Sequence, residues 1–112
     1  MEKIIEQNLL YDFYGELLTE HQRKVYENAV YNDLSLSEIA DEIGISRQGV
    51  HDLLKRCDKI MTGYEEKLKL VEKFSMTRER ITEIKKLALT TNIQNDNTDK
   101  IVRIADAILE EL

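Results

Sequence analysis

The chain has 112 residues with no proline, only four glycines and no alternating β-type runs, so we expect an all-α fold around a single hydrophobic core. Its formal net charge of −6 disfavours a protein that coats nucleic acid through charge alone, although screening leaves a local basic patch free to act. No apolar stretch approaches the roughly 18 residues of a membrane span, and an acidic N-terminus with a single cysteine favours a cytoplasmic protein.

Two helices are expected before residue 34. The first covers residues 2 to 17, and its apolar stripe consists of Ile5, Leu9, Leu10, Phe13, Tyr14 and Leu17. Thr19 and Gln22 form a capping box that begins a second helix, whose apolar residues are Val25, Tyr26, Ala29 and Val30. Asn32 and Asp33 then supply a turn.

The next segment, LSLSEIADEIGISRQGVHDLL from Leu34 to Leu54, has the pattern of a helix-turn-helix. Ser35 and Glu38 form a capping box, and Gly44 offers the positive φ that ends a helix in a sharp turn. Ser46 caps a second helix. The inward residues of that helix would be Val50, Leu53 and Leu54, and the small Ala40 suits a close crossing of the two helices.

The second motif helix has no obvious end. Apolar residues recur at three- and four-residue steps at Val50, Leu53, Cys57, Ile60, Tyr64, Leu68, Val71 and Phe74. They predict one helix from about 47 to 73, bent near Gly63. Thr77 is expected to begin a helix with the apolar residues Ile81, Ile84, Leu87 and Ala88. Residues 90–98 are expected to form a loop. Thr98 would cap a last helix with Ile101, Ile104, Ala105, Ile108 and Leu112 inward.

This pattern divides the chain into a helix-turn-helix domain, residues 1–62 with the motif at 34–56, and a C-terminal helical extension, residues 63–112. The apolar stripe of the long helix continues into the extension and must be buried against other helices. Either the last two helices fold back as an intrachain bundle, or a second copy packs against it, because near-heptad spacing suits a homodimer seam.

If the motif reads DNA, the second helix supplies the contacts. Its first turns carry the candidates for base edges, namely Arg47, Gln48, His51 and Asp52. Candidates for phosphates are Lys55, Arg56 and Lys59, with Arg23 and Lys24 on the preceding helix. Asp52 would repel phosphates unless it accepts a hydrogen bond from cytosine. Alternatively, all of these residues form an ordinary solvated helix face.

The residue pattern offers no catalytic, metal or cofactor site. Ser46, His51 and Asp52 splay onto different helix faces and form no relay. His21, His51 and Cys57 lack paired metal-ligand spacing. The glycine-containing GISRQGV lacks the Lys-Ser/Thr of a phosphate-binding loop. Cys57 lies on the apolar stripe and is expected to be a small buried hydrophobe, so we expect a non-enzyme.

Two stretches resemble known families. Residues 17–61, LLTEHQRKVYENAVYNDLSLSEIADEIGISRQGVHDLLKRCDKIM, resemble region 4 of bacterial sigma factors, which docks on the promoter −35 element. Together with MEKIIEQNLLYDFYGELLTEHQ at the N-terminus and YEEKLKLVEKF at residues 64–74, the chain resembles the YlxM family of small bacterial helix-turn-helix proteins. The resemblance covers residues 1–74 and little of the chain from Ser75 onward.

The resemblance implies a cytoplasmic regulatory protein of a low-GC Gram-positive type bacterium, linked to the signal recognition particle because the family is encoded beside its GTPase subunit. The sigma-like motif carries a groove-facing role over to Arg47, Gln48, His51, Asp52, Lys55 and Arg56. We therefore expect a nucleic-acid-binding regulator, DNA being the first candidate partner. The alternative is a non-catalytic adaptor that binds the particle's GTPase or its RNA.

Overall fold

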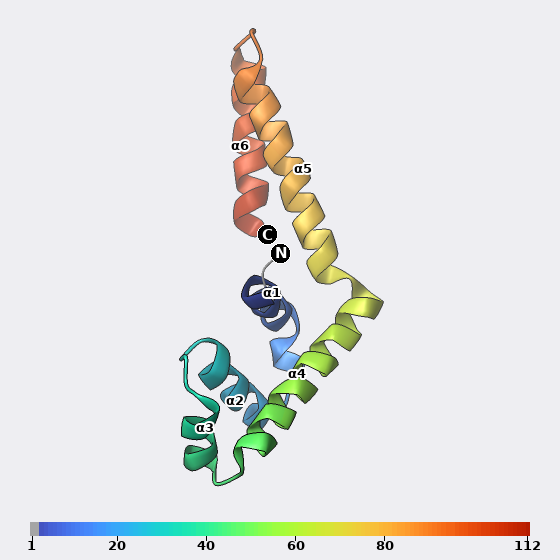
Figure 1. Ribbon diagram of the computed structural model, residues 1–112. Helices are drawn as coiled ribbons and strands as arrows, with labels where there is room; N and C mark the ends of the chain where they lie inside the picture. Colours follow the sequence, from blue (N-terminus) through green and yellow to red (C-terminus); the bar gives the residue numbers. More distant parts are fainter. Residues whose placement is uncertain (1–2) are drawn as a thin grey trace. The chain divides into compact units, whose positions relative to one another are not determined.

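The computed structural model describes the backbone of residues 3–112 and the side chains of residues 7–112, so the predicted start at residue 2 and the inward position of Ile5 lie outside the described residues. The described backbone forms six α-helices, one short 3-10 helix and no strand (Figure 1), which confirms the all-α prediction. The elements are α1 Lys3–Tyr14, η1 Gly15–Leu17, α2 Glu20–Val30, α3 Leu36–Ile43, α4 Arg47–Leu68, α5 Leu70–Thr90 and α6 Asp96–Glu111. They form two compact units, Met1–Val71 and Glu72–Leu112.

The first helix ends earlier than expected. Its last turn tightens into the 3-10 helix η1 at Gly15, which packs against the ring of Tyr11 so closely that a Cβ would lie 2.8 Å from Cε1. The chain then leaves the helix at Leu18 in an extended conformation, with φ −79° and ψ 156°. Leu18 is buried, whereas Leu17, predicted to be inward, is 54% exposed.

The boundaries of α2 follow the expected capping. Thr19 Oγ1 accepts a hydrogen bond from the Gln22 backbone at 3.2 Å, and Gln22 Oε1 accepts one from the Thr19 backbone at 2.9 Å. Both halves of the predicted capping box are thus confirmed. The predicted turn after α2 is also present, with Asp33 in the left-handed region at φ 57°.

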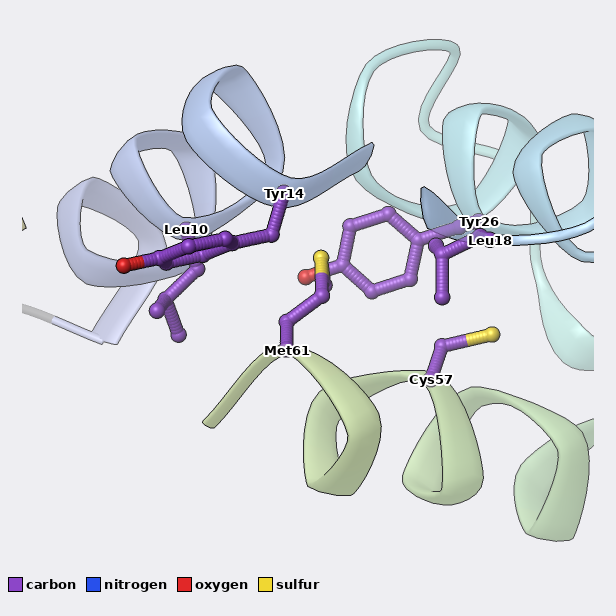
Figure 2. Packing of buried hydrophobic residues seen from close by; sticks show 6 residues of the cluster. All are labelled: Leu10, Tyr14, Leu18, Tyr26, Cys57 and Met61. Carbon is purple, nitrogen blue, oxygen red and sulfur yellow. The ribbon is translucent and has the colours of Figure 1, made fainter. Parts of the chain in front are cut away.

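The first unit has two adjoining hydrophobic clusters. In one, α4 packs against α1, α2 and the segment after η1 through Leu10, Tyr14, Leu18, Tyr26, Cys57 and Met61 (Figure 2). The other joins α2, α3 and α4 through Val25, Ile39, Ala40 and Val50. Burying a large apolar side chain contributes about 1.5–3 kcal/mol. Because α4 contributes side chains to both clusters, the unit is assembled on this helix.

The prediction of one helix to residue 73 is wrong. Lys69 takes a left-handed conformation with φ 54°, and its N–H donates to the Glu65 carbonyl at 2.8 Å, which ends α4 at Leu68. A new helix, α5, begins at once: Leu70 N–H donates to the Tyr14 hydroxyl at 3.2 Å and Val71 N–H to Glu65 Oε1 at 2.9 Å. Gly63 lies within continuous α4, so the predicted bend is displaced to Lys69.

Two further boundaries need correction. Thr77 does not begin a helix, because α5 starts at Leu70 and passes through it. Thr98 is not the cap of α6; Asn95 is, with Oδ1 accepting from Asn97 and Thr98 N–H groups at 2.9 and 3.1 Å. Thr98 instead closes the capping box by accepting from Asn95 N–H at 2.8 Å. The predicted loop therefore shrinks to residues 91–95.

The second unit is an antiparallel hairpin of α5 and α6 (Figure 1). Lys85 Nζ lies 2.6 Å from Asp106 Oδ1 and joins the two helices. Ala88 and Ala105 are its buried residues, in keeping with the inward position predicted for Ala105. The other predicted inward positions fail in part, because Ile101, Ile104 and Leu112 are 41%, 60% and 43% exposed.

Candidate nucleic-acid interface

The turn between α3 and α4 is held by local hydrogen bonds. The Ser35 and Glu38 capping box is present at 3.1 and 3.2 Å and begins α3. Gly44 ends it with φ 76°, and the N–H groups of Gly44 and Ile45 both donate to the Ala40 carbonyl, at 2.9 and 3.2 Å. Positive φ at this position favours glycine. The predicted helix-turn-helix geometry is therefore confirmed at its turn.

The start of α4 is fixed by a capping side chain and by packing against α3. Ser46 Oγ accepts a hydrogen bond from Gly49 N–H at 3.0 Å and so caps the helix as predicted. Val50 and Ile39 are completely buried between the helices, and Ala40 is 6% exposed where a larger side chain would push α3 and α4 apart. Packing thus turns the opposite side of α4 toward solvent.

We define the outer face of α4 by the exposed polar residues between positions 47 and 59, which are Arg47, Gln48, His51, Asp52, Lys55, Arg56 and Lys59. Within it, Gln48, Asp52, Lys55 and Lys59 follow helical spacing along one stripe. The face carries four basic side chains and one acidic one, against a net charge of −6 for the chain. Its charge is thus opposite in sign to that of the whole molecule.

The second acidic residue of this stretch, Asp58, is directed inward. Its Oδ1 accepts a hydrogen bond from the Tyr26 hydroxyl at 3.0 Å, and its Oδ2 lies 3.5 Å from Gln7 Nε2. The carboxylate therefore holds α1 and α2 against α4 and subtracts little from the outer face. Sequence reasoning did not single out Asp58, although its place beside the inward Cys57 was a usable signal.

Hydrogen bonds also organise the outer face. Gln48 Nε2 donates to Asp52 Oδ1 at 3.0 Å, and His51 Nδ1 lies 3.7 Å from the same oxygen. Asp52 therefore restrains the Gln48 amide and leaves its carbonyl oxygen available to an outside donor. Arg47, Gln48 and His51 line a shallow hollow together with Leu36 at the start of α3. Leu36 was not among the predicted site residues, although it directly follows the Ser35 cap.

The two basic residues predicted on α2 lie in a different setting. Arg23 is partly buried, and its Nε atom has no hydrogen-bond partner among the described residues. It borders a hollow that also contains Asp12 and Glu16. Lys24 is exposed, but the hollow beside it contains Glu20 and Glu27. Both side chains thus lie beside hollows that acidic residues also line.

Cys57 lies in the first cluster and is completely buried, as predicted (Figure 2). Burial, with the nearby Asp58 charge, raises the pKa of its thiol to about 11. A thiol of this kind is a weak nucleophile at neutral pH. Across the described residues, no group of three His, Cys, Asp or Glu side chains is arranged to hold a metal ion, and no helix is long and apolar enough to cross a membrane.

Comparison with known proteins agrees with this geometry. Residues 1–101 match the family described as "UPF0122: Putative helix-turn-helix protein, YlxM / p13 like". The chain belongs to this family. A UPF0122 protein of Acetivibrio thermocellus is 40% identical over 114 residues, covering 100% of this chain and 97% of the relative. One from Desulforamulus reducens is 48% identical over 84 residues, covering 75% and 72%.

Membership of the UPF0122 family confirms the resemblance that residues 1–74 carry, and it extends the match well into α6, to residue 101. A relative from Caldanaerobacter subterraneus is 52% identical over 77 residues, or 69% of this chain and 66% of its own length. The family description supports a helix-turn-helix protein.

Proposed function

We propose that this UPF0122 protein is a cytoplasmic regulator that binds duplex DNA with the outer face of α4, in the manner of sigma region 4. The supporting observation is the outer face itself, which is basic, exposed and packed rigidly through Val50 on a capped helix-turn-helix. Arg47 and Gln48 lie in the first turn, where a helix in the major groove reaches base edges. Lys55, Arg56 and Lys59 follow at positions suited to phosphates.

The expected binding is modest. About four phosphate contacts give a salt slope of about −4, so affinity falls steeply as salt rises. A homodimer would double the contacts and read two half-sites, as helix-turn-helix dimers do. We include dimeric action in the proposal for that reason.

The test is Arg47→Ala. A duplex selected from a random pool by the wild-type protein is used in fluorescence-anisotropy titrations. The variant should bind about 1–3 kcal/mol more weakly and discriminate less at one position, because a bidentate contact to a base is lost. Arg78→Ala, which removes the same charge from exposed α5, is the matched control and should bind as wild type does. Unchanged binding by Arg47→Ala would contradict the assignment of Arg47 to a base contact.

A second candidate is an adaptor for the signal recognition particle. Asp52 and the exposed α3 acids Glu38, Asp41 and Glu42 weaken attraction to a phosphate backbone and suit contact with a protein. Its test is capture of the particle's GTPase and its RNA, each purified, by the full chain. Binding to either, together with no duplex selected from the random pool, would favour the adaptor over the DNA-binding regulator.

A further inference from the structure

The shallow hollow beside the first turns of α4 combines polar side chains with one apolar side chain. Arg47, Gln48 and His51 line it from α4, and Leu36 lines it from the start of α3. Leu36 also packs against the buried cluster that joins α2, α3 and α4, so the fold fixes its position. The hollow therefore presents a fixed apolar group beside side chains that can form hydrogen bonds.

The carboxamide of Gln48 is oriented by Asp52. An ionised carboxylate accepts hydrogen bonds and donates none. Asp52 Oδ1 accepts from Gln48 Nε2 at 3.0 Å, which requires the NH2 group of Gln48 on the side of Asp52. The carboxamide keeps its second N–H and its carbonyl oxygen Oε1 for binding a ligand.

This orientation matches one base in the major groove. Adenine presents the N7 acceptor beside the N6 donor, and these two groups pair with the N–H and the Oε1 of a glutamine. Guanine presents two acceptors, N7 and O6, so Oε1 would face an acceptor with no proton between them. Because Asp52 opposes a flip of the carboxamide, Gln48 should select adenine against guanine.

Leu36 matches the base that pairs with adenine. The C5-methyl group of thymine is an apolar group in the major groove, and a G·C pair presents no methyl group there. Leu36 and Gln48 line the same hollow, so both can contact one base pair.

We infer that Gln48 and Leu36 together select one A·T base pair in the DNA that this protein binds. Gln48 contacts the adenine, Leu36 contacts the methyl group of its thymine, and Asp52 is a positioning residue that orients Gln48. Because it names what the outer face of α4 selects, this inference rests on the proposed function.

The experiment first replaces groups of the DNA. In the duplex that the wild-type protein selects from a random pool, each adenine is changed in turn to 7-deazaadenine, which lacks N7, and each thymine to uracil, which lacks the methyl group. Fluorescence-anisotropy titrations with the full chain measure the dissociation constant. One adenine replacement should raise it about 3- to 10-fold through a lost hydrogen bond, and replacement of the paired thymine about 4-fold through a lost methyl contact. Neither replacement changes a phosphate, so binding through charge alone would respond to none.

Variants of the protein assign the two contacts. Gln48→Ala should bind the adenine and 7-deazaadenine duplexes equally, and Leu36→Ala should bind the thymine and uracil duplexes equally. Leu34→Ala is the matched control, because Leu34 packs against the same cluster as Leu36 without lining the hollow. It should keep the uracil penalty.

Asp52→Asn tests the positioning role. Asparagine has nearly the same shape, but its amide can donate to Oε1 as well as accept from Nε2, so the Gln48 carboxamide can turn over. The preference for A·T over G·C at the sensitive position should fall about 3-fold or more. An unchanged preference overturns the role of Asp52.

The outcomes separate this selection from DNA binding itself. A wild-type protein that needs Arg47 for its duplex yet tolerates every base replacement overturns the inference and leaves the proposed function standing. Penalties that persist in Gln48→Ala and Leu36→Ala overturn it as well. If the wild type selects no duplex, the proposed function fails and the inference fails with it.

Discussion

At the scale of single residues, two glycines of the first unit differ in the backbone conformation that they adopt. Gly44 has φ 76° at the end of α3, a conformation that an L side chain adopts only with strain. Gly63 lies inside α4 with ordinary helical geometry, and a Cβ at this position would point into open space. The same substitution should therefore have opposite effects at the two positions.

Gly44→Ala should lower the free energy of unfolding by about 1–2 kcal/mol through backbone strain alone, since its Cβ would also meet no atom within 4 Å. Gly63→Ala, the matched control, should raise it by about 0.5–1 kcal/mol by favouring helix. Urea unfolding followed by circular dichroism measures both. Shifts of the same sign would contradict the assigned backbone conformations.

Buried acid groups make the protein sensitive to alkali. Burial raises the pKa of the Cys57 thiol to about 11 and that of Tyr11 to about 12, and it also raises the pKa of Tyr14 and Tyr26. Because these groups ionise later in the folded state than in the unfolded state, the unfolded state loses protons first as pH rises above about 9. Stability is complete below that pH and declines above it.

The free energy of unfolding obtained from urea titrations should consequently be flat from pH 7 to 9 and fall between pH 9 and 11. Each group contributes at most about 1.4 kcal/mol per pH unit to this fall. Cys57→Ala removes the group with the lowest unfolded pKa of these four, so the decline should begin nearer pH 10 in this variant. A midpoint that rises between pH 9 and 11 would show that the signs are reversed.

At the scale of elements, helix ends in this chain are of two kinds. The starts of α2, α3 and α4 are set by capping side chains that accept hydrogen bonds from backbone N–H groups three residues later, as Ser46 does from Gly49. The junction of α4 with α5 depends instead on Tyr14, which is 56 residues from Leu70 in sequence. Its hydroxyl donates to Glu65 Oε1 at 2.6 Å and accepts from Leu70 N–H at 3.2 Å.

Tyr14→Phe should therefore destabilise this junction while keeping the ring in its cluster. The expected cost is about 1–3 kcal/mol, because the Glu65 carboxylate and the Leu70 N–H lose a common partner. Hydrogen exchange at Leu70 and Val71 should accelerate. Tyr64→Phe is the control, since Tyr64 stacks on Tyr14 at 6.1 Å with its hydroxyl unbonded among the described residues. Equal effects of both substitutions would contradict the role of the Tyr14 hydroxyl.

At the scale of the whole molecule, the two units obtain their stability differently. The first unit has two clusters of buried side chains, including Ile39, Val50 and Met61 at 0% exposure. The second has two buried residues, Ala88 and Ala105, and exposes large apolar side chains such as that of Leu87. Because it buries less apolar surface, the second unit should open more readily than the first.

Native-state hydrogen exchange separates the two units. Amides of α5 and α6 should be less protected than those of α2, α3 and the first half of α4, because fewer large side chains are buried in the second unit. Equal protection of the two units would contradict this difference in local stability.

Much of the candidate interface could be predicted from sequence, because helical periodicity alone separates a buried side from an exposed one. The inward Val50, Leu53 and Leu54 followed from that spacing, as did exposure of the residues opposite them. The hydrogen bond from Gln48 to Asp52 was not anticipated, although residues four apart on a helix are neighbours. That Asp58 turns inward needed the position of Tyr26, which sequence spacing does not supply.

The sequence by itself determined the all-α class, the caps at Thr19, Ser35 and Ser46 and the turn at Gly44, because each depends on hydrogen bonds or dihedral preferences within a few residues. Only the tertiary structure decided where α4 ends and that many of the large apolar side chains of the hairpin are exposed. Apolar periodicity continues through Lys69 without a break, so a contact from distant Tyr14 was needed to show that the chain changes helix there.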